Sequence, residues 1–344
     1  MMKRLTYIFI LGAVLGTGCS KLASDKDMRI CMSVNIGNLD TDTKTAANAV
    51  EFTQKDISAQ RTFCPTLWFS LTPGNFSANP KHDNLGETDP LFPCHTTIEL
   101  ANTDPKYVTY KNIPLVYPHP NNSGDKTVYC AGFYPQDNWE TADGRYASHI
   151  INGSEDLMFA PIISGDWNNR LSTTEDKIQR YEHLLTWIKI NVCATTLETA
   201  RQWGSITKVE VESADQVIID LGDNNGTISY SHSVQPVEGE NQGHYITSFD
   251  DADGKELSLI SLPVGSIFCS PATNYNIKIT MKDGISRTVN VKLTDIENGY
   301  FLEKAEDSRG KLFIINLYFK PFDIVEGKSS LYYWNNKNEE LYLQ

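Results

Sequence analysis

The chain has 344 residues, of which 40% are hydrophobic and 21% are charged. These values are typical of folded globular proteins, and the length is sufficient for two domains, each with its own core. The formal net charge is −13, and no cluster of Lys or Arg offsets the acids locally. The composition therefore argues against nucleic-acid binding.

The N-terminal segment has the three parts of a secretory signal peptide. Two basic residues precede an apolar run over residues 5–14, and small residues lead from there to Cys19. The run is shorter than the roughly 20 residues that cross a bilayer. A cysteine directly after small residues is typical of bacterial lipoproteins, so we predict a signal peptide over residues 1–18 and lipid attachment at Cys19. A plain signal peptide with an incidental cysteine stays open as the alternative, because Gly16 stands where a leucine is usual.

Strand patterns dominate the next part of the chain. The first predicted strand covers residues 30–36, where apolar residues alternate with smaller or polar ones. The polar stretch over residues 165–176 is the predicted domain boundary. It divides the mature chain into an N-terminal domain, residues 19–176, and a C-terminal domain, residues 177–344. Further strand-like runs in the N-terminal domain lie at residues 65–71, 107–117 and 127–134.

The C-terminal domain has the clearest alternation. Apolar side chains at Ile188, Ile190 and Val192 point one way, and polar residues point the other. Residues 275–281 and 289–293 alternate in the same way on either side of Asp283-Gly284, which predicts a hairpin. Three further elements complete the prediction: a strand over residues 216–221, a central strand over residues 312–319, and a two-turn helix from Thr196 to Trp203 that ends at Gly204.

The sequence offers no set of residues for catalysis or metal binding. Its seven histidines are scattered, and it has no Gly-x-Ser-x-Gly elbow, P-loop or GxGxxG motif. We interpret His183 as a packing residue at the domain junction, and the acidic stretch over residues 250–254 as a solvated turn. We therefore predict no enzymatic activity, no cofactor and no metal. The remaining cysteines lack metal-ligand spacing, and both buried thiols and disulfides stay open for them: Cys31, Cys64, Cys94, Cys130, Cys193 and Cys269.

Several short motifs, taken in order, resemble the fimbrillin family, the type V pilins of Bacteroidales, and in particular its Mfa-like branch. They follow the lipoprotein start and the first strand, and together they cover most of the mature chain. The specificity lies in their order rather than in any single motif. They are the strand with an aromatic-Pro end at residues 128–135, the Asp-Leu-Met-Phe-Ala element at 156–160, His183-Leu184-Leu185 before the strand at 188–192, Gly299-Tyr300, the strand at 313–319, and Trp334.

The resemblance implies an all-β fold of two tandem transthyretin-like β-sandwich domains with Greek-key-type antiparallel sheets. It also implies a structural or accessory subunit of a cell-surface fimbria with a role in adhesion. Such subunits reach the outer membrane as lipoproteins, which here would be held by acylated Cys19. A trypsin-like protease then removes the N-terminal segment with its first strand, and a strand from another fimbrial subunit fills the empty groove.

Cleavage that frees the groove must fall after residue 36. The candidates within the polar stretch that follows are Lys44, Lys55 and Arg61, and we favour Arg61 because it stands just before the next apolar run. For the donor strand we consider the tail, residues 329–344, which has apolar residues at strand spacing. The tail as the last strand of its own domain is the alternative. A second class of function also stays open, namely a monomeric surface lipoprotein that binds a glycan or a host ligand.

Overall fold

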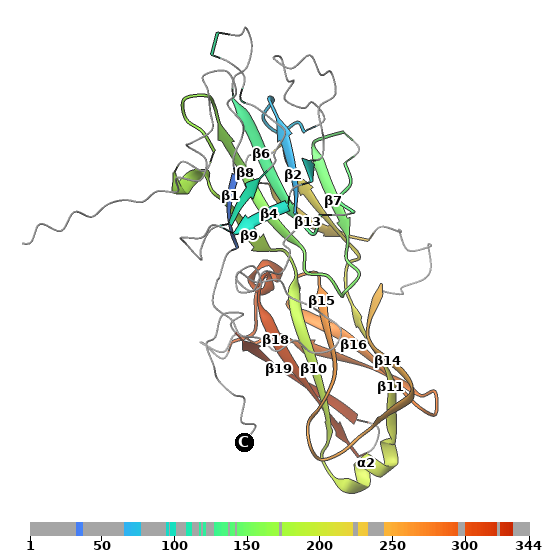
Figure 1. Ribbon diagram of the computed structural model, residues 1–344. Helices are drawn as coiled ribbons and strands as arrows, with labels where there is room; N and C mark the ends of the chain where they lie inside the picture. The colour runs from blue at the N-terminus through green and yellow to red at the C-terminus, as the bar shows by residue number, and fades with distance from the viewer. Residues whose placement is uncertain are drawn as a thin grey trace, which may run out of the picture.

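In the computed structural model the chain folds into two lobes, one at each end of an elongated molecule (Figure 1). Cys19, Arg61 and residues 333–344 lie outside the part of the chain that the structure describes. The described residues are 32–36, 65–76, 94–95, 97–100, 108–111, 117, 120–121, 127–136, 138–141, 143–171, 174–222, 226–232, 244–294, 300–321 and 324–332.

The first lobe contains an eight-stranded sheet and a three-stranded sheet. In spatial order the larger sheet is β3 (Cys94–His95), β2 (Thr66–Ser70), β6 (Val128–Tyr134), β8 (Met158–Gly165), β9 (Gln179–His183), β1 (Met32–Ile36), β5 (Val108–Lys111) and β4 (Thr97–Leu100). The smaller sheet is β13 (Thr227–Ser231), β12 (Gln216–Asp220) and β7 (Tyr146–Ile150).

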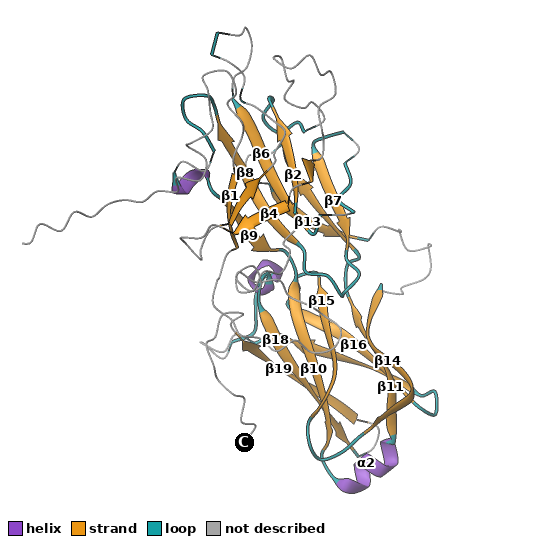
Figure 2. Cartoon of the chain, in the orientation of Figure 1, coloured by secondary structure: helices purple, strands orange, loops and turns teal. Residues whose placement is uncertain are grey.

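The second lobe is a sandwich of two four-stranded sheets. One sheet runs β15 (Leu262–Cys269), β10 (Thr186–Ala194), β18 (Leu312–Lys320) and β19 (Ile324–Tyr332). The other runs β14 (Tyr245–Glu256), β11 (Ser205–Glu212), β16 (Asn274–Met281) and β17 (Ser286–Lys292). Two short 3-10 helices, η1 (Glu175–Lys177) and η2 (Ala305–Ser308), lie in connections. Strands dominate both lobes, as Figure 2 shows, so the prediction of an all-β fold is confirmed.

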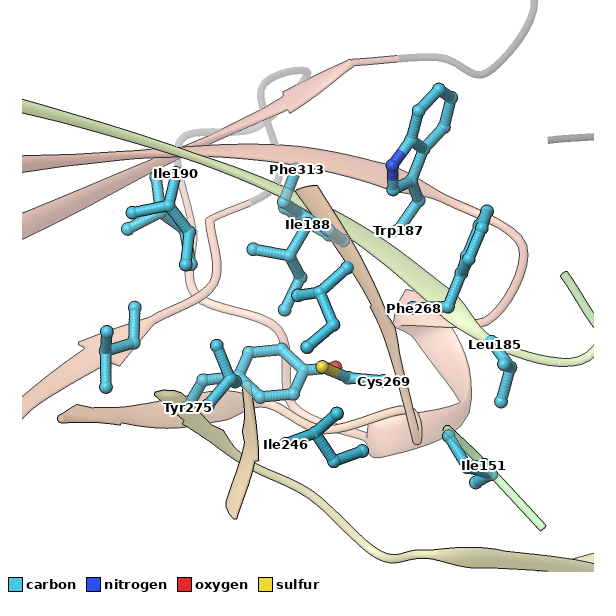
Figure 3. Close-up of a cluster of buried hydrophobic side chains, with 14 of the residues drawn as sticks. Ile151, Leu185, Trp187, Ile188, Ile190, Ile246, Phe268, Cys269, Tyr275 and Phe313 are labelled. Atoms are coloured by element: carbon cyan, nitrogen blue, oxygen red, sulfur yellow. The ribbon is translucent and has the colours of Figure 1, made fainter. Parts of the chain in front are cut away.

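The side-chain alternation seen in the sequence determines which face of each strand is buried. Ile188, Ile190 and Val192 of β10 are each at most 1% exposed, and they enter a continuous apolar core (Figure 3). The predicted hairpin is confirmed, because β16 and β17 pair antiparallel around Gly284, whose φ of +86° suits glycine. Most strand pairs are antiparallel, as expected, but β1–β9 and β10–β18 are parallel.

The helix predicted after β10 is also confirmed. It is α2 (Leu197–Trp203), which lies at the far end of the second lobe (Figure 1). The Thr196 side chain accepts a hydrogen bond from the backbone N–H of Thr199, and Gly204 ends the helix with a φ of +74°. Trp203 is buried and donates its indole N–H to the Lys320 carbonyl at 2.9 Å. These contacts attach the short helix to β18. Among the described residues, no helix is long and apolar enough to cross a membrane.

The chain passes between the lobes three times. After the first lobe it enters the second at β10, returns to the first with β12 and β13, and enters the second again at β14. In the described residues, β9 and β12 pair with strands that precede residue 176, where we predicted the domain boundary, and β13 joins the same sheet through β12. The first lobe is therefore built from segments on both sides of residue 176, and the two lobes also share an interface.

The junction between the lobes is buried and hydrogen-bonded. The Phe268 N–H donates to the Gly153 carbonyl at 2.9 Å, and the Tyr230 hydroxyl donates to the Leu184 carbonyl at 2.5 Å. Gly153 has a φ of +84°, and a Cβ there would lie 2.6 Å from Ile246 Cγ2. Ile151 and Leu185 pack into the same apolar cluster as the core of the second lobe (Figure 3).

Candidate functional site

The first candidate site is the position of β1 in the eight-stranded sheet. β1 lies between β9 and β5, where it pairs in parallel with β9 and antiparallel with β5. Val34 is opposite Gln179 on one side and Val108 on the other. Both neighbours come much later in the chain than β1. The strand is therefore an insertion that joins two parts of the sheet, rather than one arm of a hairpin.

The strand next to β1 is fixed by buried polar contacts on its other side. Gln179 and Tyr181 of β9 are both fully buried, and Gln179 donates from Nε2 to the Cys130 thiol sulfur at 3.3 Å. The Tyr181 ring reaches over β8 to Gly132 of β6, where a Cβ would overlap its hydroxyl. These contacts hold β9 in the sheet without any contribution from β1. The edge of β9 that pairs with β1 is therefore positioned independently of β1.

His183, at the end of β9, forms a buried pair with a carboxylate. Its Nδ1 lies 2.8 Å from Asp156 Oδ2, with side-chain exposures of 7% and 1%. The His183 backbone carbonyl and Cβ also lie near Gly310, at the junction of the lobes. The pair orders this junction. Within the part of the chain that the structure describes, no group of three or more His, Cys, Asp or Glu residues is placed to hold a metal ion.

Three cysteines, Cys130, Cys193 and Cys269, carry free thiols. Cys130 and Cys269 are buried, and Cys193 is half-buried. Burial raises the pKa of the Cys269 thiol strongly, and a hydrogen bond from Ser213 opposes this shift. Burial also raises the pKa of Cys193. These side chains therefore act as small apolar residues of the core. Cys31 and Cys64 lie outside the described residues.

The structure places the start of the predicted donor tail within the second lobe. Residues 329–332 belong to β19, which pairs with β18 along its whole length. Leu331 is 1% exposed and lies opposite Phe313. The remaining tail and the two predicted modification sites, Cys19 and Arg61, lie outside the described residues.

A second candidate site, which the sequence analysis did not predict, lies on the outer face of the small sheet. Glu140 forms two backbone hydrogen bonds of 2.9 Å with Ser148, so that residue 140 extends the row made by Ser148 and Ile218. Two adjoining hollows of about 210 and 710 Å³ share Glu140, Ser148 and Gln216 in their walls. We call this surface the β7–β12 groove. The residues that line it include Glu140, Tyr146, Ser148, Ile150, Glu155, Gln216 and Ile218.

The fold of this chain is similar to that of solved proteins from Bacteroidales. No family model and no curated protein matches the chain. It is similar to a candidate cell adhesion protein from Bacteroides uniformis, with a TM-score of 0.51, 12% identity, and coverage of 91% of this chain and 100% of that one. A candidate cell adhesion protein from Bacteroides ovatus gives a TM-score of 0.45, 14% identity and coverage of 91% and 99%. A fimbrial assembly protein from Parabacteroides distasonis gives a TM-score of 0.40, 11% identity and coverage of 89% and 99%.

Proposed function

We propose that this chain is a structural or accessory subunit of a cell-surface fimbria of the fimbrillin type, Mfa-like branch, with a role in adhesion. It is exported as an outer-membrane lipoprotein through Cys19 and assembles with other fimbrial subunits by strand exchange after cleavage at Arg61. Two observations support the proposal. The chain shares its fold with the cell adhesion candidate from B. uniformis, and its first described strand is an insertion between β9 and β5.

The position of β1 is the observation that carries the proposal. β1 makes ladder contacts on both edges, so its removal leaves backbone N–H and C=O groups of β9 and β5 without partners. Unpaired strand edges bind another extended segment readily, because the segment restores the ladder hydrogen bonds. Cleavage at Arg61 would separate β1 from β2 and from the rest of the subunit, and the vacant position would then accept a donor strand.

The donor in this scheme is the end of the tail. Residues 324–332 already pair within the second lobe as β19, which leaves residues 333–344 as the segment of the predicted tail that can serve a neighbour. Leu341 and Leu343 stand at strand spacing in this segment. Residues two apart in an extended strand have their side chains on the same face. Leu341 and Leu343 could therefore enter one groove together.

One experiment tests export, cleavage and assembly together. The protein is isolated from native cells and from purified stock treated with an arginine-specific protease, and its N-terminus is determined by mass spectrometry. Oligomers are assessed on gels run without boiling. We expect acylated Cys19 on the precursor, a new start at Thr62 after cleavage, and a ladder of oligomers.

Three variants test cleavage and assembly separately. Arg61→Ala should lose both the new start and the ladder, whereas the matched control Lys55→Ala should retain both. Deletion of residues 341–344 should retain cleavage and lose the ladder. Efficient polymerisation of the Arg61→Ala protein would remove Arg61 from the scheme. Normal cleavage without any ladder would instead favour the alternative, a monomeric surface lipoprotein that binds a ligand.

A further inference from the structure

The β7–β12 groove has a simple structural origin. Side chains directly opposite each other on paired strands share one face of a sheet. Ser148 lies between Glu140 and Ile218 across the strands, and between Tyr146 and Ile150 along β7. A small side chain surrounded by four larger ones leaves a hollow above it. The two hollows meet at this position.

The outer face that carries the groove is open to solvent. The inward residues of these strands, such as Ala147 and Val217, are fully buried in the core. The outward residues are not: Tyr146 is 41% exposed and Ile150 is 49% exposed. The outward side chains of β7 therefore face solvent.

The groove combines apolar surface with neutral hydrogen-bonding groups. The Tyr146 ring, Ile150 and Ile218 supply the apolar part, while the Ser148 hydroxyl and the Gln216 amide both donate and accept. Binding sites for small ligands typically have this composition, with a few polar groups that fix orientation. A sugar ring matches it, because a sugar has an apolar C–H face and hydroxyl groups around its edge.

The charge in the groove selects against anions. Glu140 and Glu155 line the hollows, and among the described residues that line them there is no Lys or Arg. The nearby Arg145 is paired with Asp220 through two hydrogen bonds of 2.9 Å. An acidic sugar or a phosphate would meet these carboxylates, and the cation beside the groove, Arg145, already has a carboxylate partner.

Two of the groove side chains are held in place before a ligand arrives. Arg145, fixed by Asp220, lies 5.1 Å from the centre of the Tyr146 ring. Gln216 accepts a hydrogen bond at its Oε1 from the Ser231 hydroxyl at 3.3 Å. Side chains that are already ordered lose less conformational entropy on binding, which favours affinity.

An extended peptide fits this surface less well than a sugar. A peptide that adds to β7 as a strand needs the backbone groups along its free edge. The N–H and C=O of Ser148, in the middle of that edge, are already bonded to Glu140. From the composition, the charge and this blocked edge, we infer that the β7–β12 groove is a binding site for neutral carbohydrate.

The inference is tested on the purified, uncleaved monomer, so its outcome is independent of fimbrial assembly. Mannose, galactose, N-acetylglucosamine, lactose and cellobiose are titrated by ligand-observed NMR up to about 10 mM, which covers the weak affinities of small open sites. Sialic acid and an unrelated extended peptide serve as comparison ligands. We expect at least one neutral sugar to bind, and to bind more tightly than either comparison ligand.

Three variants locate the binding. Ser148→Tyr fills the groove from an outward position, and Gln216→Ala removes the amide. Ser229→Tyr is the matched control, because Ser229 lies opposite Ile218 in the same row but outside the hollows. We expect the first two variants to weaken binding by about tenfold or more and the control to bind as the wild type does, with circular dichroism unchanged in all three. Absence of binding by every neutral sugar, a preference for sialic acid or the peptide, or wild-type affinity in both groove variants would overturn the inference.

Discussion

One buried thiol and two buried tyrosine hydroxyls should make the stability of the protein depend on pH in the alkaline range. Burial raises the pKa of Cys269, of Tyr230 and of Tyr275, each from the ordinary range of its side chain. Tyr275 is fully buried and donates its hydroxyl to the Ser270 carbonyl at 2.7 Å. In the folded protein these groups therefore stay neutral well above the pH at which they ionise in the unfolded chain.

The sign of the effect follows from proton binding. Above about pH 9 the unfolded chain loses these protons while the folded chain retains them, so the free energy of unfolding falls as pH rises, by up to about 1.4 kcal/mol per group for each pH unit. Below that pH the three groups contribute no pH dependence. We expect urea denaturation at pH 8 to 11, the range set by these side chains, to show this decline.

The control uses two tyrosines in different surroundings. Tyr275→Phe should give a shallower decline with pH, because one ionisable group is lost from the buried set. Tyr300 is 75% exposed, so Tyr300→Phe should leave the slope unchanged. Equal slopes in Tyr275→Phe and the wild type would show that Tyr275 does not ionise preferentially in the unfolded state.

At the level of elements, α2 depends on its N-cap. Its seven residues are too few to form a stable helix without tertiary contacts and caps. Thr196→Ala removes the acceptor for the Thr199 N–H, and we expect a loss of about 1 kcal/mol in the free energy of unfolding. Thr196→Ser retains the acceptor and should stay close to the wild type in the same chemical denaturation. A loss as large in the serine variant would show that the methyl group, rather than the cap, carries the effect.

Strands with one buried face could be predicted from sequence, but their partners could not. Alternation at Ile188, Ile190 and Val192 predicted β10 correctly, because burial of one face is a local property of the pattern. The same kind of alternation predicted β12, yet nothing in it indicates that Val217 pairs with His149 of β7, on the other side of the predicted domain boundary. Pairing depends on contacts between distant segments, which a period of two residues does not specify.

The β7–β12 groove escaped prediction for the same reason. It arises from Ser148 and its larger neighbours Glu140 and Ile218, which come from three separate segments. Each residue is ordinary in its own segment, and the hollow exists only in the assembled sheet. In contrast, the strand proposed for exchange could be predicted, because residues 30–36 carry their own alternation, and the structure has β1 at Met32–Ile36.

At the level of the whole molecule, the two lobes should unfold as one unit. Multidomain proteins often show separate transitions, but here the apolar core continues through the junction, and Phe268 of the second lobe is bonded to Gly153 of the first. We expect a single calorimetric transition, with equal calorimetric and van't Hoff enthalpies. Gly153→Ala, which would place a Cβ against Ile246 and Ile267, should lower its midpoint. Two resolved transitions in the wild type would contradict this coupling.

The path of the chain between the lobes also bears on the order in which the protein can be made. β7 emerges from the ribosome long before β12, and β10, α2 and β11 of the other lobe are synthesised between them. The first lobe therefore cannot be completed while the chain is still growing through that region. Until residues 216–220 have appeared, the edge of β7 that pairs with β12 has no partner. A nascent chain with such an edge is prone to wrong pairing, so it needs either a chaperone to shield it or rapid release as a full-length polypeptide.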